Sequence, residues 1–367
     1  MTDVGVAGDR RGMSLPLVIL LMALLAIAVT AGFARVSEER RIVGDQQAQV
    51  DAFAVAQSGL ERYVALRDSQ PGVSDSVAIP IGADDTAYVA LFRIRAPAGP
   101  VRGLYVLRSR GVSHGGRFSF NTPAAQRTVA QYATWQDASM DLDAAWTSIG
   151  GLAKNGTTGT ISGNDACGTP STPIPGVMVP TNVNTYDGYR QTPPPGTPIV
   201  PQGTPQINLV SPDSLAAAAA VSIDWNGIVN GSAILPEYAL TSAAGWPSAF
   251  ADWPTVVVDN PGTPVSLDAT QSGQGILIIT GDATLDLNFT WAGVVLIGGY
   301  ANVQGNASVQ GALVTGLNIK LGANVFNSDA GTQLNVQYNS CNLAAALARY
   351  AHLQLVANAW TDSWPEN

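Results

Sequence analysis

The chain contains a run of 21 residues, Met13–Phe33, without a charged side chain. In a helix that rises about 1.5 Å per residue, such a run spans about 30 Å, the thickness of a bilayer's hydrocarbon core. The apolar core of a cleaved secretory signal is shorter, about 7 to 15 residues, and ends at a small-x-small site. We therefore predict a membrane-spanning helix. Arg10 and Arg11 precede the run and favour a cytoplasmic amino terminus.

The same helix is predicted to continue beyond the membrane, so that it covers residues 13–67. Side chains recur there at spacings of three, four and seven, as on one stripe of an amphipathic helix. The stripe consists of Val36, Val43, Val50, Phe53, Gln57, Leu60 and Val64. A helix that is apolar all round in its first half and amphipathic in its second half is rarely needed by a soluble fold.

The amino-terminal pattern resembles that of a known family. Gly12 follows the basic pair, Met13, Ser14 and Leu15 begin the apolar run, and EERRIVGDQQAQVDAFAVAQSGLERY comes after it. This order resembles the amino terminus of type IV prepilins, and most closely that of PilX-type minor pilins. The resemblance implies a leader over residues 1–12, cleavage between Gly12 and Met13 by a prepilin peptidase, methylation of the new amino terminus, and a pilin-like head after the helix.

One position departs from the family pattern. The fifth residue after the cleavage point is glutamate in major pilins, whereas here it is Leu17, preceded by Pro16. A carboxylate buried in an apolar bundle needs a partner, such as a neighbouring subunit's terminal amine. Leu17 offers no such charge, which favours a minor subunit that initiates or caps a filament. A minor pseudopilin of type II secretion has the same anchor and lacks the same carboxylate, so it stays an alternative.

The middle of the chain predicts a small antiparallel sheet and then a linker. Apolar and polar residues alternate over 87–95, 103–109 and 127–135, which indicates a meander of strands within residues 68–150. Residues 151–260 are rich in proline and glycine, and this composition is typical of an extended linker that wraps the outside of a domain.

An internal repeat follows in the carboxy-terminal part. Gly275, Gly293 and Gly311 each open a four-residue apolar segment, at two successive intervals of 18 residues. This pattern is typical of a parallel β-solenoid, which we predict over residues 261–341 with a capping helix over 342–367. The predicted fold class is α+β: a long amino-terminal transmembrane and amphipathic helix with a small antiparallel sheet, followed by a short parallel β-solenoid (β-helix) domain.

The composition excludes several function classes. The chain has a net charge of −9 with only 12% charged residues, so a surface that neutralises many phosphates is excluded and nucleic acid is not an expected partner. His114 and His352 are the only histidines and stand far apart, which gives no local cluster of metal ligands. We expect no metal, no cofactor, no catalytic residues and no enzymatic activity.

The two cysteines favour one disulfide. Cys167 and Cys341 lie in the part of the chain that the membrane helix places outside the cytoplasm, where disulfides form and persist. A bond between them closes a long loop, for which chain entropy predicts about 4 to 5 kcal/mol of stabilisation. The alternative is a pair of buried free thiols.

Two functional hypotheses follow. The first is a minor pilin-like subunit in the bacterial inner membrane, single-pass with its bulk in the periplasm and later in a pilus or on the cell surface. Its partners are other major and minor pilins, the prepilin peptidase and the membrane. The second is a surface adhesin or polysaccharide-binding protein that contacts an extracellular surface or glycan. Four aromatic residues are candidates for stacking on such a ligand, with ordinary core packing as the alternative: Trp225, Trp246, Trp253 and Trp291.

Overall fold

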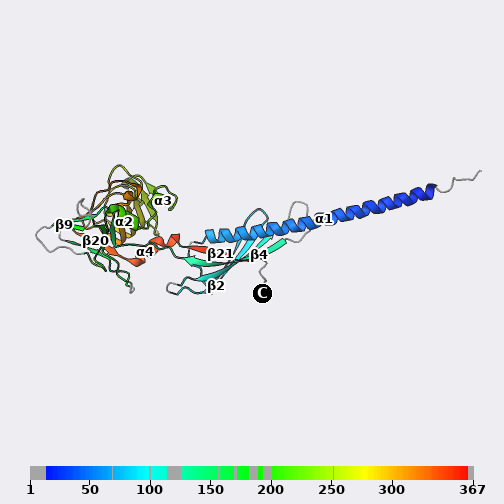
Figure 1. Cartoon of the computed structure of the whole chain (residues 1–367), viewed down its shortest axis with the longest axis horizontal. Coiled ribbons are helices and arrows are strands. Elements are labelled where there is room, and N and C mark those ends of the chain that lie inside the picture. Colours follow the sequence, from blue (N-terminus) through cyan, green and yellow to red (C-terminus); the bar gives the residue numbers. More distant parts are fainter. Residues whose placement is uncertain are drawn as a thin grey trace, which may run out of the picture. The chain divides into compact units, whose positions relative to one another are not determined.

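The chain divides into two compact units (Figure 1). The amino-terminal unit consists of residues 1–136 and 352–367, and the carboxy-terminal unit of residues 137–351. The computed structural model describes residues 14–67, 69–98, 101–113, 125–155, 158–168, 172–181, 189–192, 201–250 and 252–362. The predicted leader over residues 1–12 and the predicted cleavage residues Gly12 and Met13 lie outside the described residues.

The amino-terminal unit begins with one helix of 52 residues, α1 (Ser14–Ala65). Pro16 lies in its first turn, where a missing backbone N–H costs no helical hydrogen bond. The side chains that α1 buries fall on one stripe, at spacings of one, three and four residues, and begin only about three quarters of the way along the helix: Ala52, Val55, Ala56, Leu60 and Tyr63. The earlier members of the predicted stripe, from Val36 to Val50, are exposed.

The last turns of α1 lie on one face of a five-stranded antiparallel sheet (Figure 1). The strand order is β1 (Ser74–Pro80), β2 (Thr86–Arg95), β3 (Leu104–Ser113), β4 (Ala125–Gln136) and β21 (His352–Asp362). Alternate residues of β2 and β3 are buried, as a sheet covered on one face requires. β2, β3 and β4 coincide with the three alternating segments, and β1 and β21 enlarge the sheet on its two edges.

Two glycines bring α1 into direct contact with this sheet. A Cβ atom added to Gly111 of β3 would lie 2.1 Å from the carbonyl oxygen of Ala52 and 2.5 Å from the nitrogen of Ala56. A Cβ atom added to Gly59 of α1 would lie 2.2 Å from the Cβ atom of Ala87 on β2. Since a close-packed interior has no room for such atoms, the helix backbone meets the strand backbone at Gly111 and the Ala87 side chain at Gly59.

The carboxy-terminal unit is built from two parallel sheets. The ten-stranded sheet runs in the order β10 (Ile207–Val210), β8 (Val177–Pro180), β5 (Trp146–Ser148), β18 (Ser308–Thr315), β16 (Thr290–Ile297), β14 (Gly273–Ile279), β12 (Thr255–Val258) and β11 (Tyr238–Leu240). β20 (Leu334–Tyr338) also pairs with β18, and β7 (Gly159–Ser162) pairs with β20. The six-stranded sheet runs in the order β13 (Val265–Leu267), β15 (Ala283–Leu285), β17 (Ala301–Val303), β19 (Ser328–Ala330), β6 (Leu152–Asn155) and β9 (Tyr189–Thr192).

The 18-residue repeat sets the register of the ten-stranded sheet. Gly275, Gly293 and Gly311 lie side by side on β14, β16 and β18. Their φ angles of 108°, 121° and 151° fall in the region that favours glycine. A Cβ atom on Gly311 would also lie only 1.9 Å from the carbonyl oxygen of Gly293. Backbone conformation and space therefore both require glycine at this rung.

Apolar side chains cover both faces of the ten-stranded sheet. On one face, Leu277, Val295 and Leu313 pack with Leu285 and Val303 of the six-stranded sheet. On the other face, a second cluster includes residues of three helices: α2 (Ser214–Ala220), α3 (Trp225–Val229) and α4 (Ser340–Leu347). Short 3-10 helices complete the unit: η2 (Ala243–Gly245), η3 (Ala269–Gln271), η4 (Leu317–Leu321) and η5 (Ala348–Tyr350). Burial on both faces explains the uninterrupted apolar segments of the repeat.

The fold class predicted from the sequence is wrong. The chain is mixed α/β: one long amino-terminal helix and a five-stranded antiparallel sheet are followed by large parallel sheets of ten and six strands, in place of the predicted α+β fold with a short parallel β-solenoid. No closed solenoid is found among the described residues. The prediction counted only strands within residues 261–341, whereas parallel pairing already begins with β5 at Trp146.

Three predicted boundaries differ from the structure as well. The antiparallel sheet does not extend to residue 150, because β4 ends at Gln136 and β5 belongs to a parallel sheet. Residues 151–260 are not a linker, since they supply β6 to β12. The capping helix predicted over 342–367 is not found within residues 342–362: α4 ends at Leu347, and β21 pairs antiparallel with β4. Pairing along the edge of β4 outweighs the helical preference of the alanine- and leucine-rich segment.

Candidate functional site

The first half of α1 is a continuous exposed apolar surface. The large apolar side chains from Leu15 to Phe33 are between 50% and 74% exposed. Among the described residues, α1 is the helix that is long and apolar enough to cross a membrane. An apolar surface of this extent is unfavourable in water, so it needs lipid or other apolar helices around it.

A charged segment follows this surface before α1 reaches the sheet. Arg35 is the first charged residue after the apolar run, and its Nε atom lies 3.6 Å from Oε1 of Glu39 in an exposed pair. An exposed pair of this kind adds little stability. Val36, Ile42, Val43 and Val50 remain 47% to 64% exposed. Residues 35–51 therefore combine charge with apolar surface and bury neither in this chain.

Polar contacts fix the point where α1 leaves the sheet. The Tyr63 hydroxyl donates to the Asp75 carboxylate at 2.8 Å, and Arg67 donates to the Tyr63 oxygen at 2.5 Å. Arg67 also forms an ion pair with Asp75. Burial raises the pKa of Tyr63 above its usual value, although the charge of Arg67 opposes the rise. These contacts join the end of α1 to β1.

The four candidate tryptophans occupy different environments. Trp225 and Trp291 are 0% and 1% exposed, which leaves no ring face for a ligand. Trp246 is half-buried and makes edge contacts with Phe250 and Trp291, at centroid distances of 6.1 Å and 6.0 Å. Trp253 is half-buried against the helix-side cluster. The structure thus assigns at least Trp225 and Trp291 to core packing, with Trp291 stacked on Phe289 at 6.3 Å.

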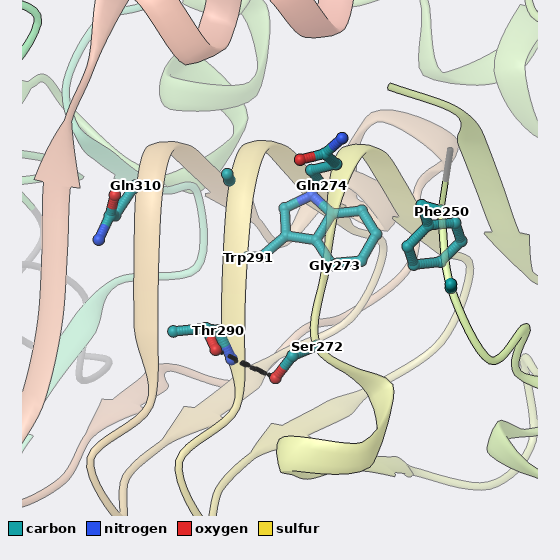
Figure 2. Close-up of a pocket in the computed structure, with 9 residues that line it drawn as sticks. Phe250, Ser272, Gly273, Gln274, Thr290, Trp291 and Gln310 are labelled. Atoms are coloured by element: carbon teal, nitrogen blue, oxygen red, sulfur yellow. Dashed lines mark hydrogen bonds between the residues drawn. The ribbon is translucent and has the colours of Figure 1, made fainter. Parts of the chain in front are cut away.

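A hollow of about 380 Å³ opens on the surface above Trp291 (Figure 2). Its lining comes from three neighbouring strands, β14, β16 and β18, and from the segment before β12: Ala249, Phe250, Ser272, Gly273, Gln274, Thr290, Trp291, Ala292 and Gln310. The amide and hydroxyl of Thr290 donate to the Ser272 oxygen at 2.9 Å and 3.1 Å. Sequence reasoning missed Phe250, Gln274 and Gln310, although the two glutamines directly precede repeat glycines.

The two cysteines are joined in the structure. Cys167 and Cys341 form a disulfide with their Cα atoms 5.3 Å apart. Asp165 holds the same region together, because its carboxylate accepts hydrogen bonds from the backbone amide of Cys167 and from the amide and hydroxyl of Ser340. The disulfide therefore links the start of α4 to the segment that follows β7, within the carboxy-terminal unit.

The two aspartates of the repeat accept hydrogen bonds from backbone amides. Asp282 accepts a hydrogen bond from the amide of Tyr300 at 3.0 Å. Asp286 accepts from the amide of Leu287 at 2.7 Å and from the side chain of Gln304 at 3.1 Å. Among the described residues, no group of three or more His, Cys, Asp or Glu side chains is placed to hold a metal ion.

One buried cation was not predicted. Lys154 on β6 is 0% exposed, and its Nζ atom donates to the carbonyl oxygens of Gly331, Asn155 and Ala330 at 2.5, 3.2 and 3.4 Å. Burial lowers the pKa of Lys154 below its usual value. Nearby, burial raises the pKa of Asp329, although a hydrogen bond from Asn155 opposes the rise.

The lowered pKa of Lys154 predicts a pH-dependent stability. At pH values between the pKa of Lys154 in the folded chain and the unfolded value of about 10.4, Lys154 holds its proton more fully in the unfolded chain. The contribution of Lys154 to the free energy of unfolding therefore rises with pH over this range. Lys154→Met removes the titrating group at similar volume. We expect the wild-type urea midpoint to rise relative to that of Lys154→Met between pH 7 and about 10.5. A difference that stays constant over this range would contradict the assignment.

Two comparisons with known proteins find no match, and a third finds two structural resemblances. No protein-family model and no curated protein matches it. Among solved structures, it resembles a glycosylated ice-binding protein from an Arctic yeast, with 15% identity, a TM-score of 0.29, and coverage of 55% of this chain and 95% of that one. It also resembles the competence-associated pilin ComZ from Thermus thermophilus, with 12% identity, a TM-score of 0.24, and coverage of 86% of this chain and 97% of that one.

Proposed function

We propose that this protein is a membrane-anchored, minor pilin-like subunit that takes part in the initiation or the tip of a type IV pilus. The observation that carries the proposal is that the two parts of α1 have different surroundings. Its first half exposes apolar side chains from Leu15 to Phe33, and its last quarter is packed on an antiparallel sheet. One helix thereby holds the folded unit at a membrane and presents a surface for neighbouring helices.

The amino-terminal sequence supports the same function. The order of basic pair, Gly12 and apolar run resembles a prepilin cleavage region, and the leader is then removed between Gly12 and Met13. Leu17 takes the position of the glutamate that neutralises a neighbouring amine in major pilins. A subunit without that charge fits a place in the filament where no such amine has to be matched.

The proposal implies a topology and a set of partners. The basic residues before the apolar run favour an amino terminus in the cytoplasm, so that the antiparallel sheet and the carboxy-terminal unit lie on the periplasmic side. In a filament, residues 14–51 of α1 contact the corresponding helices of other pilins. Apolar side chains that α1 leaves exposed between the membrane run and the sheet, such as Ile42 and Val43, become buried there.

The test is intact-mass analysis and amino-terminal sequencing of the membrane-extracted protein, in cells with and without the prepilin peptidase. We expect a mature chain that begins at N-methylated Met13 only when the peptidase is present. Gly12→Leu should block cleavage and leave the longer precursor in the membrane, whereas Gly8→Leu in the same leader should be processed normally. A chain that begins at Met1 in both strains, or after Ala31, would refute the pilin assignment.

A further inference from the structure

The hollow above Trp291 has a lining without any ionisable side chain. Its polar groups are two amides, Gln274 and Gln310, and two hydroxyls, Ser272 and Thr290. Its apolar groups are Phe250, the edge of Trp291 and two alanines. A charged ligand would lose hydration here without gaining a partner of opposite charge, so the lining favours a neutral ligand with many hydrogen-bonding groups.

The two amides stand in one straight row across the sheet. Gln274, Ala292 and Gln310 are in register on β14, β16 and β18. Adjacent strands are about 4.8 Å apart, so the two glutamines are separated by about 9.6 Å, with the small side chain of Ala292 between them. This spacing is comparable to the length of two sugar units in an extended chain. The row is therefore a low track with an amide at each end.

Both glutamines keep hydrogen-bonding capacity. Gln310 is exposed, and its side chain makes no hydrogen bond within the described part of the chain. Gln274 donates through Nε2 to the carbonyl oxygen of Asp252 at 3.0 Å, and its own carbonyl oxygen is left as an acceptor. An amide that is oriented on one side and open on the other suits hydroxyl groups, which both donate and accept.

An aromatic wall closes one end of the track. Phe250 makes edge contacts with Trp246, Trp291 and Tyr238, at centroid distances between 5.7 and 6.1 Å. A Cβ atom on Gly273 would lie 2.3 Å from the Phe250 ring, so glycine is required for the ring to lie over β14. Figure 2 shows Phe250 and Gln310 at opposite sides of the hollow, with Gln274 and Trp291 between them.

We propose that this hollow binds a neutral polysaccharide. Sugar hydroxyls would bond to the two amides and to Thr290, and an apolar sugar face would pack on Phe250. A peptide ligand is less well suited, because β14, β16 and β18 are interior strands with both neighbours paired and cannot accept an added strand. The proposal is independent of the pilin function, since it concerns only side chains of the carboxy-terminal unit.

The test is affinity gel electrophoresis of the full chain in a non-ionic detergent. The gels contain hydroxyethyl cellulose, galactomannan or dextran as neutral probes, and alginate as an anionic probe. We expect retardation by at least one neutral polymer and none by alginate. Gln310→Ala should weaken the apparent affinity by roughly 2- to 12-fold, as expected for one hydrogen bond between neutral groups.

Further variants separate binding from folding. Phe250→Leu removes the ring but keeps an apolar side chain, and it should also weaken binding. Asn302→Ala removes an amide from the outward row of the six-stranded sheet, and Tyr88→Ala removes an exposed ring from the amino-terminal unit; both should bind like wild type. Thermal melts test whether each variant is folded. The proposal is overturned if no neutral polymer retards the chain, if alginate retards it equally, or if folded Gln310→Ala and Phe250→Leu bind unchanged.

Discussion

The double substitution Leu24→Arg with Leu25→Arg should release the protein from membranes. Both side chains are more than half exposed, so no protein packing is lost. An arginine near the centre of a spanning helix costs about 2.5 to 3.5 kcal/mol on insertion scales, so two cost about 5 to 7 kcal/mol. Fractionation with an alkaline carbonate wash should find wild type in the membrane pellet and the variant in the soluble or aggregated fraction.

The matched control places the same charges outside the apolar run. Val43→Arg with Val50→Arg changes two residues of the same helix that are 64% and 61% exposed, but they lie beyond Arg35. This variant should stay in the membrane pellet. If the Leu24 and Leu25 variant stays there as well, the apolar half of α1 is not the anchor.

Gly311→Val should severely destabilise the carboxy-terminal unit. The residue has a φ of 151°, and its added Cβ atom would overlap the carbonyl oxygen of Gly293. Backbone strain and overpacking each cost about 1 to 3 kcal/mol, so the expected loss is about 2 to 6 kcal/mol in the free energy of unfolding. Urea unfolding followed by tryptophan fluorescence measures it, because Trp291 is buried on the adjacent strand β16.

Gly262→Val provides the comparison for this loss. Gly262 has no atom within 4 Å of an added Cβ and no φ in the left-handed region. Its unfolding midpoint should stay close to that of wild type. Equal midpoints for the Gly262 and Gly311 variants would mean that the glycine rung tolerates side chains, contrary to the register described above.

The long-range pattern of the sequence predicted the parts of the fold that depend on uninterrupted signals. The uncharged run from Met13 to Phe33 places α1, because no other regular structure accommodates that length of apolar chain. The repeat glycines place β14, β16 and β18 in register, because an 18-residue interval brings equivalent residues together. The alternation of apolar and polar residues predicted β2, β3 and β4, because one face of that sheet is covered.

Such signals could not reveal the short strands or the return of the chain to the antiparallel sheet in β21. β5, β6 and β8 have only three or four residues each, too few for a period to be visible, and prolines lie between β6 and β8. Residues 352–362 are compatible with either helix or strand, and the open edge of β4 decides in favour of β21. The hollow escaped prediction because burial decides which aromatic rings are accessible, and spacing does not reveal that Trp291 is buried while Phe250 is only half-buried.

The pairing of β4 with β21 has a consequence for how the head is built. Gln136 and His352 are opposite each other on these strands, so the chain leaves the amino-terminal sheet and returns to it at the same rung. The carboxy-terminal unit is thus an insertion within a hairpin, and a short turn could replace it without removing any strand of the sheet. The two units can consequently evolve separately, and a force applied to the carboxy-terminal unit is carried by two strands, β4 and β21, instead of by one chain end.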